Sequence, residues 1–158
     1  MYRRAVIPLD GSPVAETILP FILEIAGPLD MEVVLLRVVQ PVPPVVIEGS
    51  RHVVAEAVEA RRIDAEEYLA ALAVELRDKG LRVQTRVRRG GPAEEILAGA
   101  RETDSDLIAM TTHGRSGLGR LLFGSVAEEV LRHADVPVFL MRCTEAEVAR
   151  RAAREAVA

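Results

Sequence analysis

The sequence predicts an α/β protein with an open, five-stranded parallel sheet and helices on both faces. Three observations support this fold class. Short apolar runs alternate with longer segments of helical periodicity, in the order β-α-β-α-β-α-β-α-β. No hairpin turn joins consecutive strands, so the chain returns to the sheet through a helix each time. At 158 residues, the chain suffices for one domain with a sizeable core and is too short for two.

Composition excludes several classes of protein. Hydrophobic residues make up 49% and charged residues 28%, which is typical of a folded domain rather than a disordered chain. Aromatic residues make up only 3% and the formal charge is -4, which argues against a nucleic-acid-binding module. The one cysteine permits neither an internal disulfide nor a thiolate zinc cluster. No apolar run approaches the roughly 18 residues of a membrane helix, and no apolar signal region precedes the first strand. We therefore expect a cytoplasmic protein without membrane or nucleic-acid partners.

The first strand and helix are predicted within residues 4–28. Residues 4–9 form an apolar run, closed by Asp10-Gly-Ser. Ser12 followed by proline predicts a helix N-cap with proline at the first helical position. Apolar residues then recur at helical spacing up to a Gly-Pro stop, and Pro20 predicts a kink within this helix.

The next elements are a buried strand, a loop, a long helix and a further strand. Residues 31–39 are a continuous β-branched run, typical of a strand that is covered on both faces. The proline-rich residues 40–51 are expected to form a mobile loop. Residues 52–79 show helical periodicity that ends at Gly80, and residues 81–88 alternate as in a strand near a sheet edge.

The second half repeats this alternation. The predicted elements are a helix over 92–102, a strand over 106–111, a helix over 126–134, a strand over 136–141 and a last helix over 144–158. Thr144 with Glu147 predicts a capping box at the start of the last helix. In five-stranded sheets of this kind the first strand usually lies in the middle, which predicts the strand order 3-2-1-4-5. The loop with Asp10 would then face the loop after the fourth strand, where such sheets bind ligands.

That second loop is rich in glycine. Between the apolar residues 107–110 and the following helix lie Gly114, Gly117, Gly119 and Gly124, with Arg115 and Arg120 and no acidic residue. Glycines let backbone N–H groups approach a ligand, and a helix N-terminus favours an anion, so this loop predicts a phosphate site. Gly119 and Gly124-Ser have the spacing of a P-loop but lack its lysine, and no Gly-x-Gly-x-x-Gly follows the first strand.

The motif Thr111-Thr-His-Gly114, nine residues and then Gly124-Ser, read with Asp10, resembles the universal stress protein family. Nucleotide-binding members of that family carry Gly, two residues, Gly, nine residues and Gly-Ser/Thr. The resemblance extends from Val-Ile-Pro-Leu-Asp-Gly-Ser near the start to Val-Pro-Val-Phe-Leu near the end. It implies a Rossmann-like fold of the adenine nucleotide alpha hydrolase type. Residues 1–143 would form one universal stress protein domain, with 144–158 as a helical tail.

The resemblance also implies bound ATP, with Mg²⁺ or Mn²⁺ held through the phosphates. Asp10 would accept from the adenine amino group. The base and ribose would be contacted by Pro8, Leu9 and Val38, and the ribose and phosphates by Met110, Thr111, Gly114, Arg115, Gly124, Ser125 and Val126. Thr111 stands where the family motif has its first glycine. Two consequences are open: its hydroxyl would donate to ribose or phosphate, or its side chain would weaken nucleotide binding.

Structural alternatives exist for three of these residues. Ser125 with Glu128 has the pattern of a capping box, Asp10 before Gly-Ser suits a turn, and Arg115 suits a solvated loop.

The last strand, from Val136 to Met141, is apolar and uncharged, which predicts pairing with a second copy if it lies at an edge. The resemblance implies a homodimer through this strand.

The function expected from these features is an ATP-binding stress-response regulator with little or no turnover. No catalytic base beside a metal is evident, so any hydrolysis should be far slower than the median enzyme rate of ~10 per second. Two alternatives remain open. The chain is either a homodimeric partner-binding protein that has lost its nucleotide, or a slow ATPase or phosphotransferase with Ser116 or Ser125 as acceptor.

Overall fold

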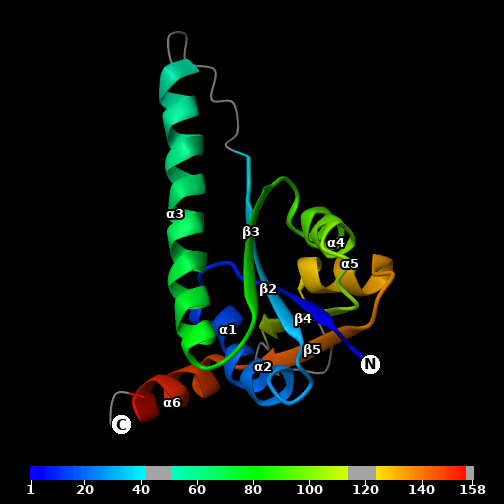
Figure 1. Ribbon diagram of the computed structural model, residues 1–158. Coiled ribbons are helices and arrows are strands. Elements are labelled where there is room, and N and C mark those ends of the chain that lie inside the picture. Colours follow the sequence, from blue (N-terminus) through cyan, green and yellow to red (C-terminus); the bar gives the residue numbers. More distant parts are fainter. Residues whose placement is uncertain (42–50, 114–123, 156–158) are drawn as a thin grey trace.

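The computed structural model describes residues 1–41, 51–113 and 124–155. Its centre is one sheet of five parallel strands in the order β3-β2-β1-β4-β5, which confirms the predicted fold class and strand order (Figure 1). The strands are β1 (Arg4–Pro8), β2 (Glu32–Val39), β3 (Val83–Arg89), β4 (Leu107–His113) and β5 (Val138–Cys143). Each strand lies within a few residues of its predicted position, because the apolar runs that predicted the strands are the segments that the sheet buries.

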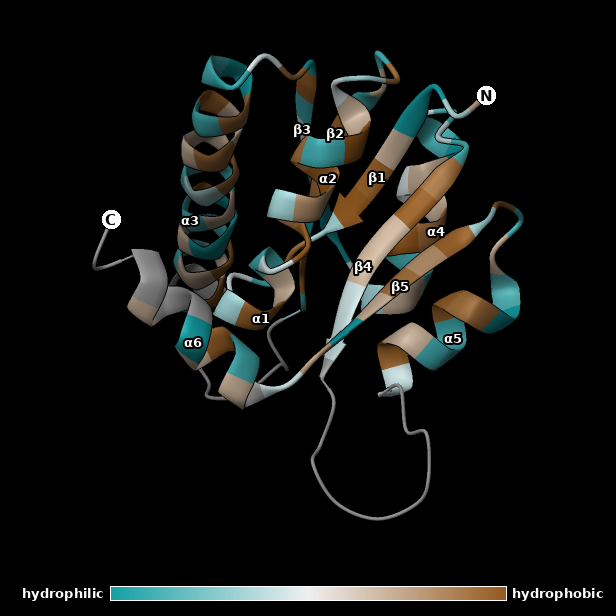
Figure 2. Ribbon diagram, turned by 90° about the horizontal axis from the view of Figure 1, so that it is seen from below, coloured by the Kyte–Doolittle hydropathy of each residue, from teal (hydrophilic) through white to brown (hydrophobic). Residues whose placement is uncertain are grey.

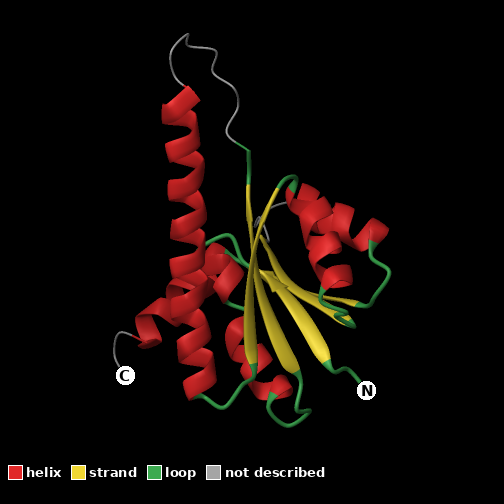
Figure 3. Cartoon of the chain, turned by 45° about the horizontal axis from the view of Figure 1, so that its top comes forward, coloured by secondary structure: helices red, strands yellow, loops and turns green. Residues whose placement is uncertain are grey.

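Helices cover both faces of this sheet (Figure 3). They are α1 (Pro13–Glu16), α2 (Leu19–Ala26), α3 (Arg51–Asp78), α4 (Pro92–Glu102), α5 (Ser125–His133) and α6 (Glu145–Glu155). One face carries α1, α2 and α3, and the other carries α4 and α5. Among the described residues, no helix is both long and apolar enough to cross a lipid bilayer.

The hydrophobic core consists of two layers, one on each face of the sheet. Successive strand residues point to opposite faces, so Ala5 and Ile7 of β1 pack towards α1–α3, while Val6 between them packs towards α4 and α5. All three side chains are fully buried. This double burial explains why β1 reads as a continuous apolar run, and the strands are correspondingly coloured as hydrophobic in Figure 2.

The segment after β1 differs from the prediction of one kinked helix. It forms two helices, α1 and α2, with a break at Thr17 and Ile18. Ser12 caps α1 as predicted, since its hydroxyl accepts from the amide of Ala15 at 3.2 Å. Pro20 lies in the first turn of α2, where its missing N–H costs nothing, whereas a continuous helix would bring its ring against the carbonyl of Glu16. The hydroxyl of Thr17 donates instead to the carbonyl of Val14 at 2.6 Å, which completes the break.

Two other helix ends follow the sequence closely. Gly80, with φ +91°, comes just after α3 and adopts the left-handed conformation that glycine tolerates. Thr144 and Glu147 form the predicted capping box of α6: the Thr144 amide donates to Glu147 Oε2 at 2.7 Å, and the Glu147 amide donates to Thr144 Oγ1 at 3.3 Å. The predicted loop over 40–51 falls largely on residues 42–50, which lie outside the described residues.

Asp106 ties the start of β4 to the start of β1. Its carboxylate accepts from the backbone amides of Arg3, at 2.9 Å to Oδ2, and of Arg4, at 3.0 Å to Oδ1. Burial raises the pKa of this carboxyl, but the amide hydrogen bonds from Arg4 and Arg3 outweigh burial, so that the pKa lies below its ordinary value of 3.8. The ionised form is therefore more stable in the folded protein than in the unfolded chain.

This difference predicts a pH-dependent effect of Asp106→Asn. A depressed carboxyl pKa contributes stability above the unfolded-state pKa, and the contribution is lost as the pH falls through the folded-state pKa. We expect the variant to lower the free energy of unfolding by about 1 kcal/mol near neutral pH. The difference from the unmodified protein should shrink towards zero at acid pH, as the pH falls through the lowered pKa of the folded protein.

Urea unfolding at both pH values checks this expectation. Asp135→Asn, which removes an exposed carboxylate paired with Arg101, is the matched control and should change stability by less than about 0.5 kcal/mol. A difference for Asp106→Asn that is equally large at both pH values would contradict the assignment.

Candidate functional site

A cavity of about 380 Å³ opens at the carboxyl ends of β1 and β4. The chain order of the sheet reverses here, because β1 pairs with β2 on one side and with β4 on the other. The cavity is lined by every described residue that the family resemblance assigned to a nucleotide: Pro8, Leu9, Asp10, Val38, Met110, Thr111, Gly124, Ser125 and Val126. Gly114 and Arg115 lie outside the described residues.

Asp10 lines the cavity from the loop that follows β1. Its Oδ1 accepts from the amide of Ser12 at 2.8 Å, so the carboxylate organises the turn, as one of its two interpretations predicted. The residue nevertheless remains exposed and belongs to the cavity wall. Gly11, with φ +84°, lets the chain turn sharply between this acid and the N-cap of α1. The turn role and a ligand role are therefore compatible.

The floor of the cavity is apolar. Val38 of β2 and Met110 of β4 belong to the same face of the sheet, the one covered by α4 and α5. Several further residues line the cavity that the sequence had not singled out: Ala15, Leu36, Gln40, Pro92, Ile96, Thr112 and Ala127. An apolar floor with few polar groups at its ends is typical of a small-molecule site, and it offers a planar base a surface on which to pack.

Thr111 and Thr112 divide between the two faces of the sheet. The hydroxyl oxygen of Thr111 lies 3.3 Å from Thr17 Oγ1, so this side chain is engaged with the break between α1 and α2. Thr112 is buried on the other side, where a Cβ added to Gly124 would come within 4.0 Å of its Oγ1. Thr112 was missed from the sequence, although alternation along β4 could have identified it, because this residue shares the face of Met110. The residue that departs from the family motif thus uses its hydroxyl within the fold.

The N-terminus of α5 also lines the cavity. Gly124 is the N-cap, with φ +81° and no side-chain cap, and Ser125 is the first helical residue. The predicted capping box of Ser125 with Glu128 is therefore wrong: the amide of Glu128 donates to the carbonyl of Gly124 at 3.0 Å. The sequence misled because Gly124 can itself adopt the cap conformation, which moves the serine one position into the helix. An uncapped helix start with an exposed serine hydroxyl suits an anion.

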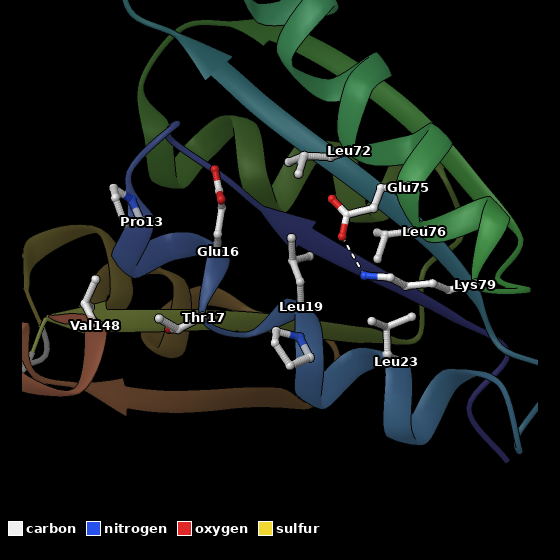
Figure 4. A pocket seen from close by; sticks show the side chains of 11 residues that line it. Pro13, Glu16, Thr17, Leu19, Leu23, Leu72, Glu75, Leu76, Lys79 and Val148 are labelled. Carbon is white, nitrogen blue, oxygen red and sulfur yellow. Dashed lines mark hydrogen bonds and ion pairs between the residues drawn. The ribbon is translucent and has the colours of Figure 1, made fainter. Parts of the chain in front are cut away.

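A second cavity, of about 250 Å³, lies among α1, α2, α3 and α6 (Figure 4). Leu19, Leu72 and Leu76 form much of its wall, with Val148 of α6 at one side. The lysine in its lining, Lys79, pairs with Glu75 at 2.5 Å, and Glu16 adds another carboxylate. This lining disfavours a phosphate, so the cavity at β1 and β4 is the candidate site.

Comparisons with known proteins agree with this architecture. The sequence model of the Universal stress protein family matches residues 1–142. Universal stress protein MJ0531 of Methanocaldococcus jannaschii is 35% identical over 144 residues, which are 90% of this chain and 83% of that protein. The solved structure of MJ0577, from the same organism, matches with a TM-score of 0.73 and 28% identity, over 90% of this chain and 97% of that one.

Two more distant structures share the fold and contain nucleotides. A universal stress protein of Archaeoglobus fulgidus was solved in complex with dAMP, with a TM-score of 0.58, 21% identity and coverage of 88% of this chain and 97% of that one. Another universal stress protein was solved in complex with cAMP, with a TM-score of 0.57, 18% identity and coverage of 89% and 97%. The match of the family model over nearly the whole chain, together with the MJ0531 relative, shows that this chain belongs to the universal stress protein family.

Proposed function

We propose that this chain is a regulatory protein of the stress response that binds an adenine nucleotide, ATP in the first place, with little or no turnover. The observation that carries the proposal is the layout of the cavity at β1 and β4. Its wall combines a carboxylate, Asp10, an apolar floor and the start of α5 at Ser125, which has no side-chain cap. These are the three features that an adenine nucleotide requires: an acceptor for the amino group, an apolar surface for the base and backbone donors for the phosphates.

Relatives support the choice of an adenine base. Two universal stress proteins of the same fold were solved with dAMP and with cAMP. A divalent ion would be held through the phosphates, because no group of three metal-ligating side chains gathers among the described residues. Since ATP carries three phosphates, it gains more than AMP from donors at a helix start, which is the reason to expect ATP as the preferred ligand.

Calorimetric titration of the purified protein with ATP, AMP and GTP tests this function. We expect ATP to bind and to stabilise the fold, by about 2.7 kcal/mol at a ligand concentration of 100 times Kd. If millimolar ATP neither binds nor raises Tm, the chain is a member of the family that does not bind ATP. Incubation with γ-labelled ATP distinguishes a regulatory protein from an enzyme. Release of labelled phosphate near ~10 per second would indicate an ATPase, and label retained on Ser125 or Ser116 would indicate a phosphotransferase. Either result would replace the regulatory proposal.

We also propose that two copies associate through β5. This strand forms one end of the sheet and pairs with β4 alone among the described strands. The side chains of Val138, Phe139, Leu140 and Met141 are only half-buried. An apolar edge strand offers both backbone donors and apolar surface to a second copy, and a soluble monomer usually protects such an edge with charge.

A further inference from the structure

The molecule holds a charged cluster beside the candidate site that none of its motifs identified. Arg37 follows Leu36 on β2 and precedes Val38, and both of these neighbours line the cavity. Its own side chain points to the opposite face of the sheet, towards α3, where its Nη2 lies 3.5 Å from Asp64 Oδ2. The side chain is 22% exposed, whereas that of Asp64 is 74% exposed, so this ion pair alone holds Arg37 weakly.

Two other contacts hold the guanidinium more firmly. Its central carbon lies 4.9 Å from the centre of the Tyr68 ring, in the arrangement of a cation–π contact. Gly11 is also close, because an added Cβ there would come within 3.4 Å of Nη2 and 3.5 Å of the central carbon. The planar group is therefore adjacent both to the aromatic ring of α3 and to the backbone of the loop after β1.

Tyr68 is itself fixed in place. Its hydroxyl donates to Glu16 Oε1 of α1 at 2.7 Å. Burial and then this hydrogen bond raise the pKa of the phenol, so that it stays a donor at all ordinary pH values. The ring thus connects α3 to α1, and Arg37 rests on a platform anchored at both helices.

The loop that Arg37 contacts is the one that carries Asp10. Leu9 is tied to β2 by its amide, which donates to the carbonyl of Leu36 at 2.8 Å, so the loop leaves β1 directly beside Arg37. Gly11 adopts φ +84° and has no side chain with which to make contacts of its own. The hydrogen bond from the Ser12 amide to Asp10 organises the turn, and the nearby guanidinium, itself held by Tyr68, packs against the turn from α3 and β2.

We propose that Arg37 is a positioning residue that holds the loop after β1 so that Asp10 can accept from the 6-amino group of an adenine base. The inference rests on the proposed nucleotide function and deepens it, because it assigns selectivity for the 6-amino group to a residue outside the cavity. Adenine presents a donor at this position and hypoxanthine presents a carbonyl, which a carboxylate repels. Selectivity for ATP over inosine triphosphate (ITP) therefore reports how well Asp10 is placed.

Arg37→Met tests the proposal, since methionine keeps an unbranched apolar stem and removes the planar cation. We expect the affinity for ATP to fall about tenfold, because a hydrogen bond to a charged group is weakened, while the affinity for ITP stays within about twofold. Arg62→Met is the matched control: Arg62 lies on α3 itself, and its exposed side chain pairs with Glu59 and Glu66 of the same helix. It should leave both affinities unchanged.

Combination with Asp10→Asn shows whether Arg37 acts through Asp10. Asp10→Asn alone should remove most of the preference for ATP over ITP, and the double variant should show the same ratio as Asp10→Asn. Tyr68→Phe, which removes only the hydrogen bond to Glu16, should lower the ratio in the same direction by a smaller factor. If Arg37→Met does not fold, Tyr68→Phe tests the proposal in its place.

The outcomes separate this inference from the proposed function. If the unmodified protein binds neither ATP nor ITP, the nucleotide function itself is wrong. If it binds both equally, or if Arg37→Met weakens both equally or neither, nucleotide binding stands and the positioning role of Arg37 is overturned.

Discussion

Replacing Gly124 by valine should weaken ATP binding by roughly 100-fold or more, because two or more charge-assisted hydrogen bonds, each contributing about 1.5–3 kcal/mol, are lost. Gly124 caps α5 with φ +81°, a conformation that β-branched residues avoid. A side chain here would point to Thr112, the buried residue at the inner wall of the cavity. Valine would thus both fill the space in which phosphates are proposed to lie and turn the amides of α5 away.

Gly80→Val is the matched control for this substitution. Gly80 has a similar φ of +91° and lies beyond α3, and a Cβ added there meets nothing within 4 Å. Both variants should lose a similar stability of about 1–3 kcal/mol from backbone strain. Only Gly124→Val should lose ATP affinity in calorimetric titration. Equal ATP affinities in the two variants would show that the phosphates do not bind at the start of α5.

Ser125→Pro and Ser125→Ala also test whether the phosphates bind at the start of α5, and they introduce no backbone strain at Gly124. Proline is favoured at the first helical position, which Ser125 occupies, so the helix should form normally. Proline removes both the hydroxyl and the backbone N–H, whereas alanine removes the hydroxyl alone. We expect Ser125→Pro to weaken ATP binding more than Ser125→Ala. The reverse order would indicate that the backbone donor of this residue has no part in binding.

Leu140→Lys should convert the proposed dimer into a monomer of 17.2 kDa. Leu140 is half-buried in β5, the strand that forms one end of the sheet. Lysine at an edge strand opposes pairing with a second copy, and its aliphatic stem can still cover the apolar surface next to it. Loss of about 1.5–3 kcal/mol of apolar burial from each copy corresponds to a weakening of the dimer by at least tenfold.

Sedimentation or light scattering over a range of concentrations measures this change. Val74→Lys is the control, since Val74 is a 56% exposed residue on α3, which packs against β2 and β3 at the other end of the sheet. It should leave the mass of the assembly unaltered. A monomeric unmodified protein, or a Leu140→Lys variant that remains dimeric with unchanged affinity, would show that β5 is not the interface.

The fold was predictable because its strongest determinants are local. Continuous apolar runs specify strands that are buried on both faces, and Ser12-Pro, Gly80 and the pair of Thr144 and Glu147 mark helix ends through hydrogen bonds within a few residues. The break between α1 and α2 was misjudged as a kink. Whether a helix bends or stops at a proline depends on alternative partners for the freed carbonyls, and Thr17 supplied one.

Which residues line the candidate site was predictable, but the directions in which their side chains point were not. Asp10 follows β1, Val38 lies in β2 and Met110 in β4, and parallel pairing brings the ends of these strands together. The motif alone did not reveal that the Thr111 hydroxyl turns to Thr17 while Thr112 faces the cavity. Side-chain direction follows from the register of β4 and from what packs on each face, and both are set by segments distant in sequence.

Periodicity, turn residues and chain topology therefore sufficed to predict the order of elements and the edge position of the last strand, whereas the residues proposed to bind a nucleotide were named by the family resemblance. The tertiary structure was needed to show that Gly124 rather than Ser125 caps α5, and that Arg37 lies against Tyr68 and close to Gly11 in the loop of Asp10. These features are contacts between residues up to 31 positions apart, as between Arg37 and Tyr68, or choices between adjacent positions. Their energies come from packing and electrostatics in three dimensions, which no local pattern along the chain records.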